Sequence, residues 1–237
     1  MTPFDDLLVV QEHDTAIDRL RHRRATLPEL AELARIEEEL VALERTLGEA
    51  AAARDDVARR EKRLEDEVAT IEAKITEIEG RMYSGAVTVP RELQAMQAEI
   101  ESMKRRCSAL EDDILEAMTE REPLDADVAR QEATRRHLDD EGARLRGAVA
   151  EAQATLDAEL ALEAAARDAA AGKVPAALAT LYEQLRAKLG GVGAARLVNG
   201  RCTGCHLTLP ATELDRIRKE PPDTLVRCDQ CSRILVH

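Results

Sequence analysis

Residues 33–82 read LARIEEELVALERTLGEAAAARDDVARREKRLEDEVATIEAKITEIEGRM, and this stretch decides the fold. Alternating steps of three and four residues from Leu33 reach fifteen positions, of which thirteen are apolar. These positions are Leu33, Ile36, Leu40, Leu43, Leu47, Ala50, Arg54, Val57, Glu61, Leu64, Val68, Ile71, Ile75, Ile78 and Met82. A hydrophobic repeat of 3.5 residues predicts a long helix that packs along one narrow seam of a left-handed coiled coil.

A second seam with the same period follows in the sequence. It passes through Leu93, Met96, Ile100, Met103, Cys107, Leu110, Ile114, Ala117, Arg121, Leu124 and Val128. The pattern weakens near residues 131–135 and resumes at Leu138. Pro123 lies inside this seam and predicts a local bend, because proline removes one backbone hydrogen bond from a helix.

The two seams are separated by a short segment, residues 80–92, that reads GRMYSGAVTVPRE. Gly80 and the Ser84-Gly85 pair interrupt the helical pattern, and Pro90 suits the first turn of a new helix. Two long helices joined by a short turn are expected to fold back on each other. The sequence therefore predicts an antiparallel helical hairpin.

Two residues predict an irregularity in this hairpin. A turn centred near residue 85 places Pro28 opposite Gly142, since each lies 57 residues from the centre. Pro28 interrupts the helical pattern, so residues 4–27 are expected to form a separate helix. The predicted fold is mainly α: a coiled-coil hairpin over residues 1–172, kinked near Pro28 and Gly142, followed by a small β domain.

Some seam positions carry residues that are unusual in an apolar stripe. The polar ones are Arg54, Glu61, Arg121 and Arg135. Polar residues at such positions usually fix the register of a coiled coil, and we interpret them in that way. Cys107 also occupies the seam, where a buried thiol behaves as a small apolar group.

The composition agrees with helices that bury narrow stripes. The 237 residues include one Phe, two Tyr and no Trp, while 34% are charged and the formal net charge is −13. From Gly190 onward there are seven Lys or Arg and five Asp or Glu, which gives +2, so the preceding 189 residues carry −15. Strongly acidic surfaces repel nucleic acids and anionic membranes. Any attraction to phosphate is therefore predicted to come from the C-terminal segment.

The sequence also bears on localisation. No apolar run approaches the length of about 18 residues that a transmembrane helix needs. The first residues, MTPFDDLLVV, are acidic where a signal peptide is basic. A cytoplasmic protein is expected, and in that compartment paired cysteines bind metals or perform redox chemistry more often than they form structural disulfides.

The C-terminal domain, predicted over residues 173–237, contains two Cys-x-x-Cys pairs. Cys202 and Cys205 form the first pair, and Cys228 and Cys231 form the second after 22 intervening residues. Each pair adjoins a strand-like run, and a short helix is expected after Pro175. Two turns of this kind supply four thiolates to one point, which predicts a zinc ribbon with one structural Zn²⁺.

The two cysteine pairs are compatible with other kinds of site. A thioredoxin-like dithiol, a disulfide pair and an iron–sulfur site use the same residues, but the dithiol needs a βαβ context that the sequence lacks. Four thiolates and one Zn²⁺ leave a charge of −2 on the site. Arg201, Arg227 and Arg233 are placed to offset this charge, and a plain surface role is equally compatible with the sequence. His206 follows Cys205 directly and is interpreted as a residue outside the ligand set.

The segment between the cysteine pairs predicts a short helix near residues 211–219. Arg216, Arg218 and Lys219 form its basic side and are the candidate contacts for nucleic acid phosphates. The ribbon contains no aromatic residue on which a base could stack, so recognition of single strands is weakly supported.

The chain resembles a known family along nearly its whole length. The pattern comprises Tyr83-Ser84-Gly85, Thr88, Pro90, Glu92-Leu93-Gln94, Glu99-Ile100, Lys104-Arg105-Arg106 and the last Cys pair followed by Arg233-Ile234-Leu235. It is similar to that of bacterial C4-type zinc-ribbon proteins with an N-terminal coiled-coil hairpin. The resemblance implies a helical hairpin with a zinc ribbon. It also implies a role in nucleic acid binding, with links to transcription through sigma-factor or RNA contacts.

One position departs from the family. Its members usually have Gly after the last cysteine, whereas this chain has Ser232. If a left-handed backbone is required there, Ser adds roughly 1–2 kcal/mol of strain. Tyr83, Pro90 and Leu93, at the turn of the hairpin, are the candidate contacts for a protein partner.

Three functions are compatible with the sequence. The first is a non-enzymatic zinc-binding adaptor, linked to transcription or RNA regulation, that binds a protein partner and, through the ribbon, RNA or DNA. The second is a thiol redox sensor that uses either cysteine pair. The third is an architectural spacer, and a homodimer is compatible with it because antiparallel hairpins can pair into four-helix bundles.

Overall fold

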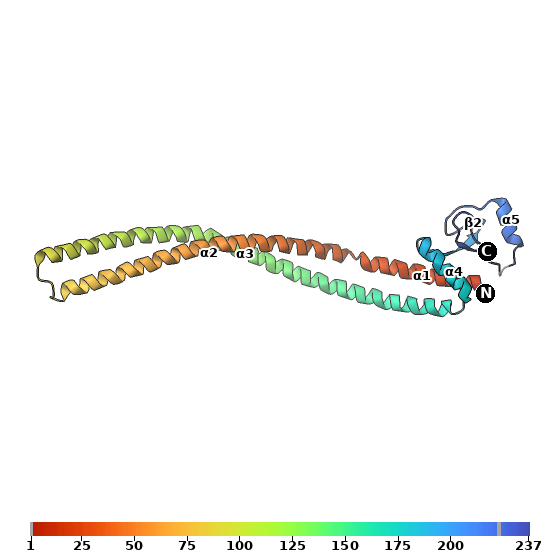
Figure 1. The fold of residues 1–237 in the computed structure, drawn as a ribbon, viewed down its shortest axis with the longest axis horizontal. Coiled ribbons are helices and arrows are strands. Elements are labelled where there is room, and N and C mark those ends of the chain that lie inside the picture. Colours follow the sequence, from red (N-terminus) through yellow and green to blue (C-terminus); the bar gives the residue numbers. More distant parts are fainter. Residues whose placement is uncertain (1, 222–223) are drawn as a thin grey trace. The chain divides into compact units, whose positions relative to one another are not determined.

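The computed structural model describes residues 2–221 and 224–237. Its helices are α1 (Pro3–Ala25), α2 (Pro28–Tyr83), α3 (Pro90–Ala171), α4 (Ala176–Lys188) and α5 (Ala211–Lys219). Its strands are β1 (Ala194–Val198), β2 (Arg201–Cys202) and β3 (Ile234–Val236). Figure 1 shows these elements along the chain. The predicted class, long helices with a small C-terminal sheet, is confirmed.

The chain divides into two compact units. The hairpin unit is Leu33–Arg144, and the ribbon unit combines the residues up to Glu32 with those from Leu145 onward. Helices α2 and α3 each contribute to both units. The domain boundary predicted between residues 172 and 173 stays a prediction, because this division follows packing rather than independent folding.

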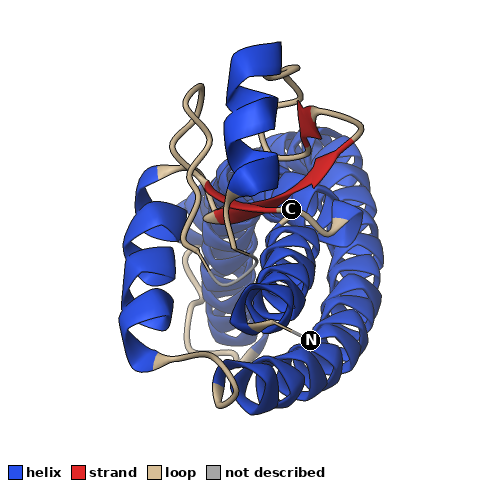
Figure 2. Ribbon diagram, turned by 90° about the vertical axis from the view of Figure 1, so that its right-hand side faces the viewer, coloured by secondary structure: helices blue, strands red, loops and turns tan. Residues whose placement is uncertain are grey.

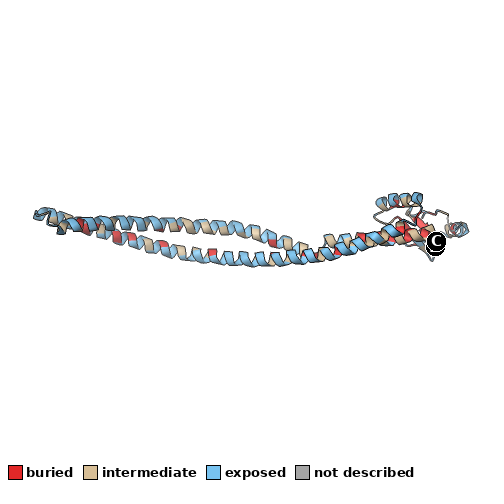
Figure 3. Ribbon diagram, turned by 90° about the horizontal axis from the view of Figure 1, so that it is seen from below, coloured by how far each residue is buried: buried red, intermediate tan, exposed pale blue. Residues whose placement is uncertain are grey.

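In the hairpin unit, α2 and α3 run antiparallel and are joined by the turn at residues 84–89 (Figure 1). The buried residues of α2 all occupy predicted seam positions: Ile36, Val57, Glu61, Ile75 and Ile78. Near the turn, Ile75 and Ile78 pack with Ile100 and Cys107. The interpretation of Cys107 as a packing residue is therefore confirmed. Figure 3 shows how few positions along these helices are buried.

A polar layer interrupts this seam. Glu61, only 6% exposed, pairs with Arg121, and the neighbouring Arg60 pairs with Glu120. Both pairs join α2 to α3 within the hairpin unit. Because the buried carboxylate finds its partner in only one alignment of the two helices, the layer can fix the register, as the sequence predicts.

The interruption predicted at Pro28 is confirmed, since α1 ends at Ala25 and α2 begins at Pro28. Its counterpart differs, because α3 is continuous from Pro90 to Ala171 and passes through both Pro123 and Gly142. A glycine inside a helix costs only about 1 kcal/mol relative to alanine, so it does not by itself end one. The helix is thus not interrupted at Gly142, and a kink of the continuous α3 there stays a prediction.

The ribbon unit contains a sheet with the order β2-β1-β3 (Figure 2). Strand β1 pairs antiparallel with β2 and parallel with β3. One face of the sheet, with Ala194, Ile234 and Val236, packs on α1, α4 and the end of α3. The other face, with Ala195 and Leu235, packs on the cysteines and α5. All three residues of β3 are buried, so the sheet is a middle layer.

None of the helices in residues 2–221 and 224–237 is long and apolar enough to cross a membrane.

The polar layer generates a test. Replacing Glu61 by Ala leaves the guanidinium of Arg121, whose side chain is 34% exposed, without its buried partner. The free energy of unfolding is expected to fall by about 1–2 kcal/mol, measured by urea denaturation followed by circular dichroism. Lys62→Ala is the control, because Lys62 pairs with Asp66 at the surface and its loss should leave stability unchanged. Equal effects of the two substitutions would contradict a structural role for the layer.

Candidate metal centre

The four cysteines meet at the second face of the sheet. Cys202 ends β2, Cys205 lies in the turn that follows, and Cys228 and Cys231 lie in the turn before β3. Their Sγ atoms all lie within 4.8 Å of one another. The Sγ atoms of Cys202 and Cys231 are 3.9 Å apart, and those of Cys205 and Cys228 are 4.0 Å apart.

These distances fit a zinc ion. A tetrahedron with Zn–S bonds of about 2.3 Å has edges of about 3.8 Å. A disulfide would bring two sulfurs to about 2.05 Å, so no disulfide links these cysteines. Cys202 and Cys228 are buried, while Cys205 and Cys231 are half-buried. The site holds one structural Zn²⁺, and four protein thiolates leave no coordination position open for a substrate.

The two turns share one backbone geometry. In the first, the N–H of His206 donates to the carbonyl of Cys202 over 2.8 Å. In the second, the N–H of Ser232 donates to the carbonyl of Cys228 over 2.7 Å. His206 and Ser232 both adopt the left-handed region, with φ of 61° and 62°. The condition for strain at Ser232 is therefore met, and His206 occupies the equivalent position of the first turn, outside the ligand set.

An arginine braces each turn. The Nε of Arg201 donates to the carbonyl of His206 over 2.7 Å, and the Nε of Arg227 donates to the carbonyl of Ser232 over 3.0 Å. The sequence analysis overlooked this repetition. Residues 201–209, RCTGCHLTL, and 227–235, RCDQCSRIL, share Arg, both Cys and the final Leu, and a self-comparison of the ribbon would have detected the pattern.

Arg233 connects the second turn to the helices. Its guanidinium donates to the carbonyl of Val192 over 2.9 Å and to that of Leu189, at the end of α4, over 3.1 Å. Its side chain lies so close to Gly204 that a Cβ there would come within 2.6 Å of the Arg233 Cδ. Position 204 of the first turn therefore requires glycine, whereas the equivalent position of the second turn holds Gln230.

The thiols differ in acidity before they meet a metal. Burial raises the pKa of Cys202, and it raises the pKa of Cys228 to about 12. Burial also opposes ionisation of Cys231, but the backbone and side chain of Arg233, together with the Cys228 and Cys205 thiols, outweigh it and lower the pKa of Cys231 to about 7. Arg233 is thus the arginine that directly stabilises a thiolate of the site.

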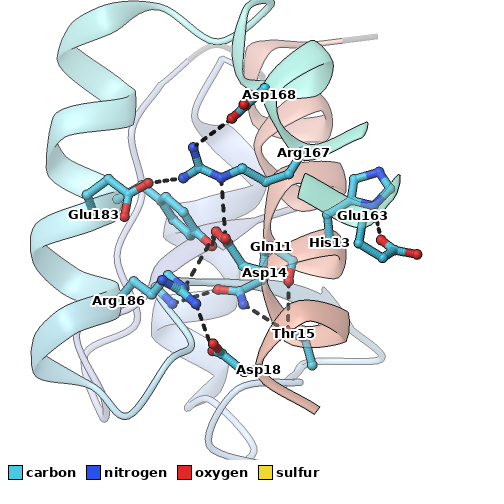
Figure 4. Close-up of polar contacts among 12 residues, drawn as sticks. Gln11, His13, Asp14, Thr15, Asp18, Glu163, Arg167, Asp168, Glu183 and Arg186 are labelled. Atoms are coloured by element: carbon cyan, nitrogen blue, oxygen red, sulfur yellow. Dashed lines mark hydrogen bonds and ion pairs between the residues drawn. The ribbon is translucent and has the colours of Figure 1, made fainter. Parts of the chain in front are cut away.

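A polar network attaches the ribbon to α1 (Figure 4). The Oε1 of Gln11 accepts the N–H of Gly193 over 2.7 Å and that of Ala194 over 3.3 Å, and its Nε2 donates to the carbonyl of Gly191 over 3.0 Å. Gln11 is buried, and its partners lie about 180 residues away in the sequence. The Gln11 side chain therefore satisfies the backbone N–H groups of Gly193 and Ala194 at the start of β1.

The second centre of the network is Asp14, which is 4% exposed. It accepts a hydrogen bond from the hydroxyl of Tyr182 over 2.7 Å and lies 3.3 Å from Arg167 and 3.5 Å from Arg186. Burial and the hydrogen bond to Asp14 raise the pKa of Tyr182. α1, α3 and α4 are thereby joined around one buried carboxylate (Figure 4).

The predicted nucleic acid contacts on α5 are exposed but largely neutralised. Arg216 binds Glu213 over 3.0 Å, and Arg218 lies 3.6 Å from Asp215, each pair within one turn of the helix. Lys219 is exposed as well. The sequence places basic residues here correctly, yet two of the three have an acidic neighbour.

The predicted partner contacts lie at the turn of the hairpin. Tyr83 is 85% exposed, Pro90 is exposed, and Leu93 is half-buried in the seam. The structure therefore brings Tyr83 and Pro90 to the surface at the two ends of the turn. A partner contact at each of these residues stays a prediction.

Both parts of the chain are similar to known protein families. Residues 10–190 match the CT398-like coiled coil hairpin domain, and residues 201–235 match the C4-type zinc ribbon domain. The chain belongs to the CT398-like coiled-coil hairpin family. The resemblance noted from the sequence is thus confirmed for both the hairpin and the ribbon.

Family relatives cover almost the whole chain. The Mycobacterium tuberculosis proteins MT2288 (strain CDC 1551) and Rv2229c (strain H37Rv) are each 30% identical over 230 residues, which is 97% of this chain and 93% of theirs. A solved structure from Mycobacterium smegmatis is 27% identical, has a TM-score of 0.87, and matches over 99% of this chain and 97% of its own. CT398 from Chlamydia trachomatis, 20% identical with a TM-score of 0.68 over 99% and 97%, shares the fold.

Zinc binding to this family member should depend steeply on pH. Without the metal the thiols keep most of their protons at neutral pH, because a free Cys has a pKa of about 8.5, and burial in the folded ribbon raises the pKa of Cys202 and Cys228 further. Zn²⁺ expels these protons, so acid favours the metal-free state and affinity rises with pH. The logarithm of the association constant should rise by about two or more per pH unit near pH 7, measured by chelator competition. A slope near zero would show that the thiols are already ionised.

Ser232 offers a second test. Glycine adopts a positive φ without the penalty of a Cβ, so Ser232→Gly should relieve about 1 kcal/mol of strain. The expected result is roughly fivefold tighter zinc binding in the same competition assay. Thr203→Gly is the matched control, because Thr203 is not left-handed and its hydroxyl accepts the N–H of Arg196, so zinc binding should weaken. Weaker binding in both variants would refute the strain at Ser232.

Proposed function

We propose that the chain is a non-enzymatic adaptor in the cytoplasm. Its zinc ribbon is structural, the turn of its hairpin binds a protein, and the ribbon unit binds nucleic acid. The link to transcription or RNA regulation rests on the family resemblance alone. The proposal that the turn binds a protein is supported mainly by the exposure of one aromatic residue at that turn.

That residue is Tyr83. The chain has three aromatic side chains, and the other two, Phe4 and Tyr182, are buried in the ribbon unit at 8% and 1% exposure. Tyr83, by contrast, is 85% exposed. Tyrosine is enriched among the residues that dominate protein–protein interfaces, because it combines a large apolar ring with one hydroxyl. A solvent-exposed tyrosine in a chain so poor in aromatics is best explained by a partner.

The surroundings of Tyr83 indicate the chemistry of that partner. Val89 is 48% exposed, so the turn presents an apolar surface. Arg81 and Arg91 flank it, are exposed, and form no ion pair within the described residues. An apolar pocket with an acidic rim would complement this tip, which we define as residues 81–91.

The metal centre supports a non-enzymatic role. All four coordination positions are taken by protein thiolates, so the zinc ion has no site at which to activate water or a substrate. Within residues 2–221 and 224–237, no other group of His, Cys, Asp or Glu residues is spaced to share a metal ion.

The alternative of a thiol redox sensor draws on the partial exposure of Cys205 and Cys231. Its weakness is the arrangement of the sulfurs. A dithiol switch requires one close and accessible pair, whereas here each half-buried cysteine faces a buried one across the site. The tetrahedral spacing of all four sulfurs suits a shared ion better than either pair alone.

Site-specific photo-crosslinking tests the adaptor. A photoreactive phenylalanine analogue at position 83 of the full chain, expressed in its native host, should crosslink to one protein that mass spectrometry identifies. Tyr83→Ala should then weaken the affinity for that protein at least about tenfold, because a central tyrosine is replaced.

Val41 provides the matched control. It is 69% exposed on α2 of the same unit but lies far from the tip in sequence, so crosslinking there reports accidental contacts. The same crosslinked proteins at positions 41 and 83, or unchanged affinity of the Tyr83→Ala variant, would overturn the assignment of the tip.

A further inference from the structure

The most concentrated positive charge of the chain lies in α1. Residues 19–24 read RLRHRR, which is four arginines and one histidine in a protein with a net charge of −13. Basic residues in the last turn of a helix favour its dipole, and this accounts for part of the cluster. Arg19, however, lies further from the end of the helix at Ala25, so a second role is open to it.

The structure shows which of these charges remain unneutralised. Arg24 binds Asp157 over 2.7 Å, and Arg21 lies 3.7 Å from Asp18. Arg19 and Arg23 are exposed and form no ion pair among the described residues. They are four residues apart, so they lie on the same side of the helix about 6 Å apart along its axis.

An open groove of about 460 Å³ adjoins this part of α1. Arg19 and His22 line one side of it, and Gly190 and Gly191 line the other. Both glycines have positive φ, 70° and 91°. The space beside Gly190 is open, so a ligand can approach its backbone closely, whereas the Asp18 carboxylate fills the space beside Gly191. Asp18 also lines the groove, but its carboxylate is held by Arg186 over 2.7 Å.

We propose that the basic face of α1, formed by Arg19, His22 and Arg23, binds the phosphodiester backbone of a nucleic acid along this groove. Guanidinium groups donate two hydrogen bonds to one phosphate, and two of them spaced along a helix suit a row of phosphates. These contacts are to phosphates, and no Phe, Tyr or Trp lines the groove, so binding is independent of base sequence and falls steeply with salt.

The inference rests on the nucleic acid half of the proposed function and moves its site. The sequence assigns this role to α5, where Arg216 and Arg218 are paired with acids of the same helix. A charge already paired must first lose its partner, whereas Arg19 and Arg23 are available without that cost. The structure therefore favours α1 over α5 as the phosphate contact.

Fluorescence anisotropy with the full-length, zinc-loaded protein tests the site. The probes are a mixed-sequence RNA of about 20 nucleotides and a duplex DNA of the same sequence, titrated between about 50 and 200 mM salt. Arg19→Gln with Arg23→Gln should weaken binding at least about tenfold and reduce the salt dependence by about 1.5 in slope, as expected for two lost phosphate contacts. The probe that binds more tightly identifies RNA or DNA as the ligand.

Arg216→Gln with Arg218→Gln is the matched control, because it changes the net charge by the same amount. It should alter affinity less than about twofold. Arg19→Lys with Arg23→Lys keeps both charges and should retain most of the binding, which separates loss of phosphate contacts from damage to α1. Circular dichroism and zinc content must match the unmodified chain in each variant.

The outcomes are distinct. Equal losses in the α1 and α5 variants would reduce the effect to overall charge, and loss in the α5 variant alone would return the site to α5. Either result overturns this inference but keeps nucleic acid binding. No binding by the unmodified protein at about 50 mM salt would overturn both. Equally tight binding of a polyglutamate peptide would show that the ligand is a carboxylate surface instead.

Discussion

Four sulfurs at the edge length of a zinc tetrahedron join two turns that lie 26 residues apart in the sequence. This closure brings β3 beside β1 in a parallel pair, which needs a long connection and here includes α5. Strands of two to five residues without an aromatic side chain between the sheet and α5 cannot hold such a layer alone. Structural zinc contributes about 10–16 kcal/mol, as much as the whole stability of a typical domain, so the sheet depends on the metal.

The sheet in turn supports the helices of its unit. Ile234 and Val236 of β3 pack with Phe4 and Leu7 of α1, so residues near the two ends of the chain share one core. Gln11 adds the acceptor for the N–H groups that begin β1. Removing the ribbon would expose this apolar face and leave Gln11 without its partners. The ribbon is therefore a layer of a larger unit, and point substitutions probe its role more cleanly than a truncation does.

Much of this could be predicted because local patterns determine it. The 3.5-residue repeat identified the buried positions of α2, Pro28 marked a helix start, and the Cys-x-x-Cys pairs identified the ligands. The network around Gln11 and Asp14 could not be predicted, because each residue finds its partners about 150 to 180 positions away and nothing in its neighbours specifies them. The roles of Arg201 and Arg227 could be predicted in part. A repeat in the sequence places an arginine before each cysteine pair, but only the structure shows that each arginine donates to the carbonyl of a left-handed residue.

The charge of the ribbon unit is the clearest example of a property that the sequence alone does not predict. The excess of +2 counted after Gly190 suggests that the ribbon attracts anions, but the structure uses most of that charge internally. Arg201 and Arg227 donate to backbone carbonyls of the zinc turns, and Arg233 donates to the carbonyl of Leu189 at the end of α4 and helps to lower the pKa of Cys231. Together they face a site whose four thiolates and Zn²⁺ carry −2. A charge bound in this way contributes little to the field outside the molecule, because its field is compensated within a few ångströms. The exposed potential of the ribbon unit therefore depends on which arginines lack partners, and this is a property of the fold that no count along the sequence contains.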